Sequence, residues 1–255
     1  MNVIAEIEEL IRLERTLFGD TLLVEAASAK EEDVTRHPKQ AGADDPSLFD
    51  DSLSGKPPIT AEPWGTCETL EDLNAQICSC LKCPLGETRT KFVFGVGNPH
   101  ATLLLIGEAP GVDEDAQGEP FVGRAGQLLN KILAAIGFGR EKVYICNILK
   151  CRPPGNRKPA QDEVSHCIPY LKKQIEIIKP KLILCLGLTA AENLLRTKES
   201  LTKLRGRVLE YEGTPLMVTY HPAALLRNPN WKRPAWEDVQ AARKLHDELV
   251  ANEVR

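Results

Sequence analysis

Short apolar runs along the chain predict the strands of a buried sheet. Each run holds five or six residues and is nearly continuous rather than alternating. Such runs indicate strands that are covered on both faces. The four runs are Thr102–Gly107, Val143–Ile148, Leu182–Gly187 and Leu216–Tyr220.

Longer stretches with apolar residues at helical spacing lie between and after these runs. Strands that are separated by helices are typical of a parallel sheet with helices packed on both faces. We therefore predict an α/β fold, a three-layer α/β/α sandwich around a central, mostly parallel four-stranded sheet. The predicted helices are Gly126–Ile136, Gln161–Ile178, Thr189–Leu195 and Trp236–Val250.

The loops that follow the strands are the expected place for chemistry, because ligands of such sheets bind beyond the carboxyl ends of the strands. These loops begin at Gly107, Asn147 and His221. The first of them continues with Pro110 and Gly111, which allow a sharp turn that presents backbone N–H groups to a ligand.

The first 66 residues differ in character from the rest of the chain. Apolar residues at mostly helical spacing predict an amphipathic helix over residues 1–18, which docks on the body or on a protein partner. Residues 19–66 mix acids, Pro, Gly and Ser without periodicity, so we expect an acidic, disordered linker. The folded, chemistry-bearing domain is expected over residues 67–255.

Charge is distributed unevenly over the 255 residues, although the net charge is only −4. Residues 1–66 carry 6 Lys and Arg against 14 Asp and Glu, whereas the remainder carries 26 against 22. A mildly basic body suits a polyanionic partner. No stretch reaches the ~18–20 apolar residues of a membrane span, and the acidic start is unlike a signal peptide. We therefore expect a cytoplasmic protein without a membrane partner.

Eight cysteines in a cytosolic chain of this length favour metal binding over disulfides. Cys80 and Cys83 form a CxxC motif, and Cys151 and Cys167 follow at a distance along the chain. Four thiolates can hold a Zn²⁺ ion or a [4Fe–4S] cluster. Cys78 competes with Cys80 as a ligand.

The last apolar run leads into a segment that suits DNA. His221 lies at the end of the predicted strand, where it can donate a hydrogen bond to developing negative charge. Leu225 and Leu226 follow and precede Arg227. Exposed apolar side chains of this kind enter a base stack as wedges, while a neighbouring cation holds phosphate.

Together these motifs resemble the family 4 uracil-DNA glycosylases, the iron–sulfur type of bacteria and archaea. The resemblance covers residues 78–240, about two thirds of the chain, and leaves out residues 1–66. The matching stretches, in chain order, are CLKCPLGETRT, FGVGNPHATLLLIGEAPGVDEDAQGEPFVGRAGQLLNKIL, VYICNILKCRPPGNRKP, EVSHCIPYLKKQIEIIKPKLILCLG and TYHPAALLRNP.

The resemblance implies a [4Fe–4S] cluster held by Cys80, Cys83, Cys151 and Cys167. We expect this cluster to be structural. It would tie the segment before the first strand to the loop and helix near residues 151–167, and would orient the neighbouring basic side chains toward phosphates. These basic side chains are Lys150 and Arg152.

The resemblance also implies a uracil pocket at the loops after the strands. Phe121 would stack on the flipped base, Asn147 would pair with its polar edge, and His221 would lie near O2. Glu108 and Ala109, after Gly107, lie on the turn that faces the base. The residues implied to enter or hold the DNA are Leu225, Leu226 and Arg227.

Two features of the pocket bear on the reaction. A covalent-trapping relative carries another turn residue and a basic, His-containing insert, whereas this chain has Ala109 and the plain GNRKP, so we expect hydrolysis. The residue that activates water is left open among three acids, of which we favour the first. They are Glu108, Glu114 and Asp115.

The expected function is removal of uracil from single- or double-stranded DNA, leaving an abasic site that initiates base excision repair. The expected protein is monomeric and associated with the nucleoid in the cytoplasm. Two alternative functions are consistent with the same sequence features. One is a non-catalytic protein of this fold that binds damaged or single-stranded DNA, and the other is a Zn-stabilised interaction protein whose acidic leader recruits partners.

Overall fold

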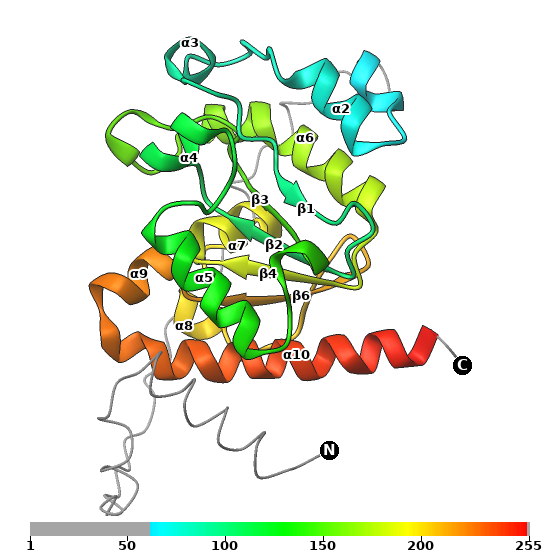
Figure 1. Ribbon diagram of the computed structural model, residues 1–255, viewed down its shortest axis with the longest axis vertical. Helices are drawn as coiled ribbons and strands as arrows, with labels where there is room; N and C mark the ends of the chain where they lie inside the picture. Colours follow the sequence, from blue (N-terminus) through cyan, green and yellow to red (C-terminus); the bar gives the residue numbers. More distant parts are fainter. Residues whose placement is uncertain (1–61, 254–255) are drawn as a thin grey trace, which may run out of the picture.

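One sheet forms the centre of residues 62–253, the part of the chain that this computed structural model describes (Figure 1). Its strand order is β1-β3-β2-β4-β6-β5. The four inner strands run parallel and the two outer strands run antiparallel to their neighbours. The strands are β1 (Val96–Gly97), β2 (Leu103–Gly107), β3 (Tyr144–Asn147), β4 (Leu182–Leu186), β5 (Leu209–Tyr211) and β6 (Thr214–Thr219).

The predicted α/β class is confirmed, and the strand count is corrected from four to six in the described part. Both additional strands are short edge strands. β5 joins β6 through Glu212 and Gly213, whose positive φ angles of 48° and 83° are those of a tight hairpin turn. In β1, a side chain at Gly97 would bring its Cβ within 2.0 Å of the Val143 carbonyl oxygen, so only glycine fits beside β3.

Two apolar cores separate the sheet from the helices on its two faces. Residues of β2 alternate between them, with Leu104 and Ile106 in one core and Leu103 and Leu105 in the other. The first core is covered mainly by α2 (Leu70–Ile77), α6 (Gln161–Ile178) and α7 (Leu188–Leu195). The second is covered by α5 (Arg124–Ala135) and α10 (Lys232–Glu253). The three layers are therefore those predicted.

Shorter helices carry the loops around the sheet. Within residues 62–253, no helix is both long and apolar enough to cross a membrane. The short α-helices are α3 (Leu85–Thr88), α4 (Val112–Gln117), α8 (Leu201–Leu204) and α9 (Pro222–Arg227), and the 3-10 helices are η5 (Pro63–Thr66), η6 (Arg140–Lys142), η7 (Pro154–Asn156) and η8 (Pro229–Trp231).

The folded domain includes the last residues that the sequence assigned to the linker. Pro63–Thr66 forms η5, and Trp64 is buried with its ring edge-on to Tyr170 of α6 at 4.9 Å. The predicted linker therefore ends before Pro63. The predicted helix over residues 1–18 and the rest of the linker lie outside the described residues.

Candidate active site

Three strand ends lie close together at one edge of the sheet. Gly107 ends β2 and Asn147 ends β3, and a Cβ on Gly107 would lie 2.4 Å from the Asn147 Oδ1 atom. The same Cβ would lie 2.6 Å from the Phe121 ring. That ring in turn lies beside His221, which follows β6, with 5.4 Å between the ring centroids. The end of β2 is thus packed closely against the Asn147 amide and the Phe121 ring, with the His221 imidazole beside that ring.

Asn147 presents an unpaired acceptor at these strand ends. Its side chain is 2% exposed, and its Oδ1 atom has no hydrogen-bond partner among the described residues. A buried acceptor without a donor costs free energy, so such atoms are rare in folded proteins unless a ligand or water satisfies them. The geometry fits a ligand that brings an N–H group to this point.

His221 has one defined neutral tautomer. Its Nδ1 atom accepts a hydrogen bond from the backbone N–H of Ala223 at 3.1 Å, where it caps α9. Burial and then the nearby charge of Arg227 lower the pKa of His221 from 6.5 to about 4. The ring is therefore neutral at pH 7 and carries its proton on Nε2, which is free to donate to a ligand.

Phe121 is held in an unusual backbone conformation. Its φ of 54° lies in the left-handed region that bulky residues rarely adopt, so other contacts must hold it. Arg140 of η6 supplies two of these contacts, because its guanidinium donates to the carbonyl oxygens of Phe121, at 3.2 Å, and Pro120. Gly126 packs so closely that a Cβ there would lie 1.8 Å from the Phe121 carbonyl oxygen.

A carboxylate fixes the other side of the same loop. The Glu114 side chain accepts hydrogen bonds from the backbone N–H groups of Gly111, Val122 and Gly123 at 2.9–3.0 Å. It thereby ties the turn after β2 to the residues that follow Phe121. A carboxylate committed to three donors is poorly placed to take a proton from water.

The acids considered for water activation are thus reduced to one. Asp115 is buried and accepts the backbone N–H of Thr90 at 2.9 Å, so it also serves the backbone. Glu108 remains, partly exposed on the turn after Gly107. Its neighbour Ala109 packs against the first apolar core.

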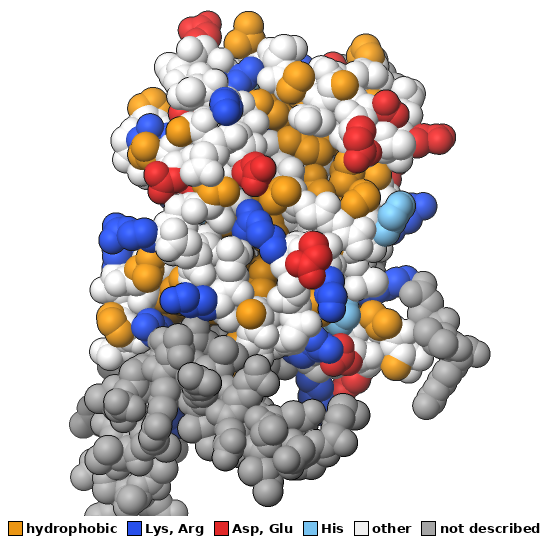
Figure 2. All heavy atoms as spheres, viewed as in Figure 1, with side chains coloured by type: hydrophobic (Ala, Val, Ile, Leu, Met, Phe, Trp, Pro, Cys, Tyr) orange, Lys and Arg blue, Asp and Glu red, His pale blue; other side chains and the backbone are white. Residues whose placement is uncertain are grey.

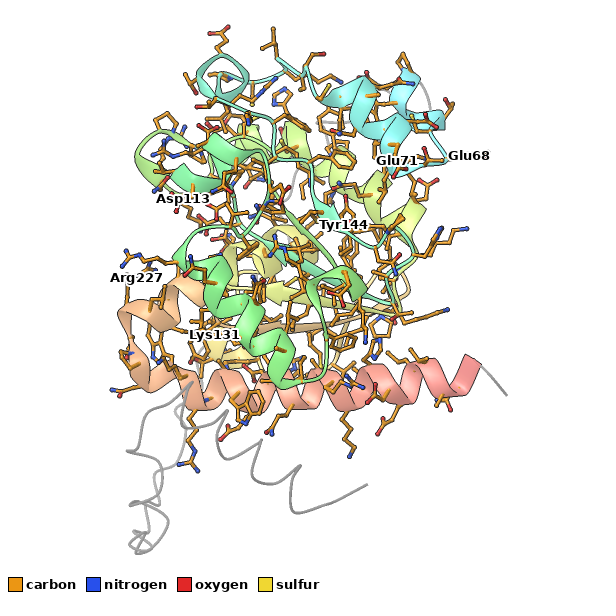
Figure 3. The ribbon with its side chains drawn as sticks, in the orientation of Figure 1. Glu68, Glu71, Asp113, Lys131, Tyr144 and Arg227 are labelled. Carbon is orange, nitrogen blue, oxygen red and sulfur yellow. The ribbon has the colours of Figure 1, made fainter. Side chains whose placement is uncertain are left out.

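The two leucines of the predicted DNA wedge differ in exposure. Leu225 is 2% exposed and lies in an apolar pocket with residues of α5 and α10. This corrects the expectation that both leucines are exposed wedges. Leu226 is 45% exposed, and Arg227 lies beside it at the edge of the molecule, at the end of α9 (Figure 3).

The four predicted cluster cysteines lie in one neighbourhood. Cys80 and Cys83 lie between α2 and α3, Cys151 follows β3, and Cys167 lies in α6. Each thiol acts electrostatically on at least one of the other three. Within residues 62–253, however, no three His, Cys, Asp or Glu side chains are placed to hold a single metal ion.

Four thiolates are the donor set of either a tetrahedral Zn²⁺ ion or a [4Fe–4S] cluster. Hydrogen-bond donors also surround the sulfurs. The Tyr170 hydroxyl donates to Cys80 Sγ at 3.2 Å, and Arg89 donates to Cys151 Sγ at 3.4 Å. Such donors suit thiolates that carry the negative charge of a bound cluster.

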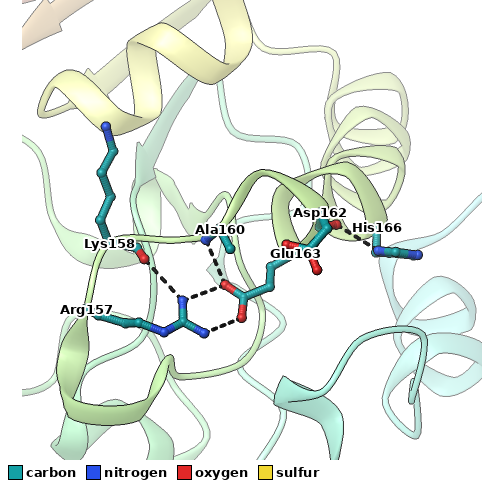
Figure 4. Close-up of polar contacts among 6 residues, drawn as sticks. All are labelled: Arg157, Lys158, Ala160, Asp162, Glu163 and His166. Atoms are coloured by element: carbon teal, nitrogen blue, oxygen red, sulfur yellow. Dashed lines mark hydrogen bonds and ion pairs between the residues drawn. The ribbon is translucent and has the colours of Figure 1, made fainter. Parts of the chain in front are cut away.

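The loop that joins the last two cysteines is fixed by an ion pair (Figure 4). Glu163, buried at the start of α6, accepts from Arg157 at 2.5 and 2.9 Å and from the backbone N–H of Ala160 at 2.8 Å. In the same turn, the His166 Nδ1 atom lies 2.7 Å from the Asp162 carbonyl oxygen. These bonds hold the start of the helix that carries the fourth cysteine.

Lys150 does not face solvent, which corrects the expectation that it is oriented toward phosphates. It is fully buried, and its Nζ atom donates to the Asn147 carbonyl oxygen at 2.9 Å and to Gln174 Oε1 at 2.6 Å. Burial, the larger effect, raises the pKa of the Cys167 thiol, whereas the Lys150 backbone, which lies beside that thiol, lowers its pKa. Lys150 therefore joins the cysteine region to the backbone of Asn147.

The chain is similar to known proteins over most of its described part. Residues 94–240 match the model of the "Uracil DNA glycosylase superfamily". A type-4 uracil-DNA glycosylase of Archaeoglobus fulgidus is 45% identical over 181 residues, which cover 68% of this chain and 91% of that protein. The type-4 enzyme of Sulfurisphaera tokodaii is 43% identical over 187 residues, 70% of this chain and 85% of its own. That of Thermotoga maritima is 43% identical over 180 residues, with 69% and 94% covered.

Proposed function

The chain belongs to the uracil-DNA glycosylase superfamily, and from this premise we propose that it hydrolyses the N-glycosidic bond of uracil in DNA, leaving an abasic site for base excision repair. A base in a duplex must be turned out of the stack before such chemistry. The observation that carries the proposal is the buried, unpaired Oδ1 atom of Asn147 between Phe121 and the Gly107 turn.

Asn147 selects uracil in this proposal. Uracil offers an N3–H donor and an O4 acceptor, whereas cytosine offers the reverse pattern at the same positions. The Oδ1 atom accepts N3–H and the amide group donates to O4, while the Phe121 ring stacks on the base. Cytosine would leave both partners unpaired in a buried site, and that is a strong basis for rejection.

His221 stabilises the departing base. The C1′–N1 bond breaks, its electron pair leaves with uracil, and negative charge collects on O2. The neutral imidazole donates from Nε2 to this oxygen, and a donor that is already oriented stabilises such charge at little cost of reorganisation. The tautomer required is the one that the Ala223 hydrogen bond favours.

Water completes the reaction at the sugar. Its oxygen bonds to C1′, and one of its protons passes to Glu108 and then to solvent. The departed uracil anion takes up a proton from solvent, so that the products are an abasic sugar and uracil. Glu108 is proposed because the carboxylates of Glu114 and Asp115 are engaged with backbone N–H groups. Glu108 lies on the turn after Gly107, next to the space where the base is bound.

Leu226 and Arg227 are proposed as the residues that face the DNA. Leu226 would fill the space left by the flipped base, and Arg227 would hold a neighbouring phosphate. Leu225 is proposed instead to anchor α9 to the core, because it is buried there.

A [4Fe–4S] cluster is proposed at Cys80, Cys83, Cys151 and Cys167. When bound, the cluster supplies a structural link between the segment before β1 and α6. Hydrolysis itself neither gains nor loses electrons. Arg89 supports this site, because it donates to Cys151 Sγ and to the carbonyl oxygens of Cys78 and Cys80.

The remaining parts of the proposal concern the whole protein. We propose a monomer that works at the nucleoid in the cytoplasm, with the domain that begins at η5 as the catalytic domain. Residues 1–18 are proposed as an amphipathic helix that binds a protein partner, joined to the domain by the acidic linker.

The test is an excision assay on oligonucleotides with one uracil, single-stranded and double-stranded, followed by alkaline cleavage of abasic sites. We expect cleavage at uracil only, none with cytosine at that position, and a rate about 10²- to 10³-fold lower for His221→Ala. DNA binding without abasic product would overturn the proposal in favour of a non-catalytic binding protein.

A further inference from the structure

An exposed aromatic stack lies next to the strand end that delivers His221. The ring of Trp231, in η8, is stacked on that of Tyr220 with 5.1 Å between centroids and 19° between planes. Trp231 is 40% exposed, whereas Trp64 and Trp236 are buried. Tyr220 immediately precedes His221, so the stack begins one residue from the proposed active site.

Further contacts hold the Tyr220 ring of the stack. The Arg205 guanidinium lies over this ring, 5.0 Å from its centroid. Arg205 is itself held by the buried carboxylate of Asp238, with two hydrogen bonds of 2.8 and 2.9 Å. Thr219 donates to the same carboxylate at 2.9 Å. A surface aromatic ring that is held in one orientation loses little entropy when a ligand stacks on it.

The surroundings of Trp231 are basic. From Arg227 to Arg233 the chain reads RNPNWKR, with three cations and no acid. The nearest acid in sequence, Glu237, pairs with Arg233 at 3.6 Å, and both side chains are largely exposed. Figure 2 shows Lys and Arg side chains gathered at the edge of the molecule near α5 and α9. An aromatic face among cations matches a nucleic-acid strand, with its bases and phosphates.

We propose that Trp231 is a stacking platform for an unpaired base of the DNA strand that carries the uracil, beside the nucleotide that enters the pocket. The inference rests on the proposed function for the identity of the DNA. A strand whose uracil occupies the pocket passes the end of β6, and η8 packs against α9, which bears Leu226 and Arg227. A neighbouring base that is free of its complement can lie on the Trp231 ring, so the platform favours single-stranded substrate.

The test compares Trp231→Ala with Trp231→Tyr, which keeps an aromatic face. Single-stranded oligonucleotides carry a hydrolysis-resistant 2′-fluorinated uracil nucleotide with 2-aminopurine on its 5′ or 3′ side. Stacking of a base on an aromatic side chain is worth about 1–3 kcal/mol, a factor of about 5 to 150 in affinity. We expect Trp231→Ala to raise the Kd by about 5-fold or more and Trp231→Tyr to stay within about twofold of the parent.

Val208→Ala is the matched control, because Val208 is an apolar residue that is 58% exposed at the start of the β5 edge. It should leave the Kd unchanged. The parent protein should quench 2-aminopurine at one of the two positions, and Trp231→Ala should abolish that quenching. Equal Kd values and equal quenching for the parent and Trp231→Ala would overturn the platform.

The same variants and oligonucleotides distinguish two further outcomes. Loss of thermal stability in Trp231→Ala without any change in DNA binding would mean that the ring serves only to pack against Tyr220, which also overturns the proposal. If the parent shows Trp231-dependent binding but does not excise an unmodified uracil, the platform stands and the proposed glycosylase reaction fails.

Discussion

The Nδ1 atom of His221 accepts the backbone N–H of Ala223, and this bond determines which imidazole nitrogen can meet a ligand. Protonation of the ring would put a hydrogen on Nδ1 and break the bond. Burial opposes the charged form as well, which is why the pKa falls to about 4. The histidine is therefore arranged to act as a neutral donor.

The first prediction concerns pH. The folded pKa of about 4 lies below the ordinary 6.5, so the unfolded chain binds a proton at His221 before the folded chain does. The free energy of unfolding should therefore fall as the pH decreases from 6.5 toward 4. Titration of His221 should not change the rate of single-turnover excision between about pH 8 and 5, and the rate should decline near pH 4.

His221→Gln is the control for this profile, because a glutamine amide can donate but does not titrate in this range. The ratio of parent to variant rate should be constant above about pH 5. A step in that ratio near pH 6.5 would contradict a neutral histidine in the folded protein.

The second prediction concerns Asn147. Asn147→Ala should lower uracil excision by about 10²-fold or more, because both pairing groups are lost in a buried site. Its melting temperature should not fall through loss of the Oδ1 atom, since that atom has no partner among the described residues. Circular dichroism melting and single-turnover rates measure the two effects. A variant that excises uracil normally would remove Asn147 from the pocket.

The third prediction tests the close packing around Gly107. A methyl group there would lie 2.4 Å from Asn147 Oδ1 and 2.6 Å from the Phe121 ring. Because both atoms belong to the side chains that are proposed to hold the base, the added methyl group should displace them and disturb base binding. We expect kcat/KM to fall by at least about 10-fold while the melting temperature changes by only a few degrees. An unchanged kcat/KM would show that the base binds elsewhere.

The fourth prediction concerns Arg140. Arg140→Met keeps an unbranched apolar side chain but removes the bonds to the Pro120 and Phe121 carbonyls, so the strained backbone at Phe121 can relax. A misplaced stacking ring should lower kcat/KM by about 10- to 100-fold. Arg140→Lys should restore part of this loss.

Arg243→Met is the matched control for Arg140. Arg243 also donates to a backbone carbonyl, that of Ile136 at 2.6 Å, and lies over the Phe138 ring at 4.7 Å. Arg243→Met should lower the melting temperature about as much as Arg140→Met does, but it should leave kcat/KM unchanged. Equal losses of kcat/KM in both variants would mean that Arg140 serves stability alone.

The central layer of the fold was predictable because continuous apolar runs report burial directly. β1 and β5 escaped prediction because edge strands of two or three residues leave no such run. Leu225 and Leu226 are adjacent residues of the same type, so the sequence does not distinguish them. Only the path of α9 determines that Leu225 faces the core. Sequence patterns contain no information of that kind for a helix of six residues.

The candidate site divides in the same way. Gly107, Asn147 and His221 could be predicted because each lies at or next to the end of a predicted strand. Arg140 and Glu114 were missed as supports of the Phe121 loop, since their partners are backbone carbonyl and N–H groups that any residue offers. Buried hydrogen bonds to the main chain become visible only when the fold is known.

The last prediction distinguishes the cysteines. Cys80→Ala should lose the broad absorbance near ~400 nm expected of an anaerobically purified [4Fe–4S] protein, and should melt at a lower temperature. Cys78→Ala is the control, because Cys78 is exposed two residues earlier and its thiol donates to the Ala75 carbonyl oxygen at 3.6 Å. It should keep absorbance and iron content. Colourless parent protein with one bound zinc, or loss of iron in Cys78→Ala but not in Cys80→Ala, would contradict the proposed ligands.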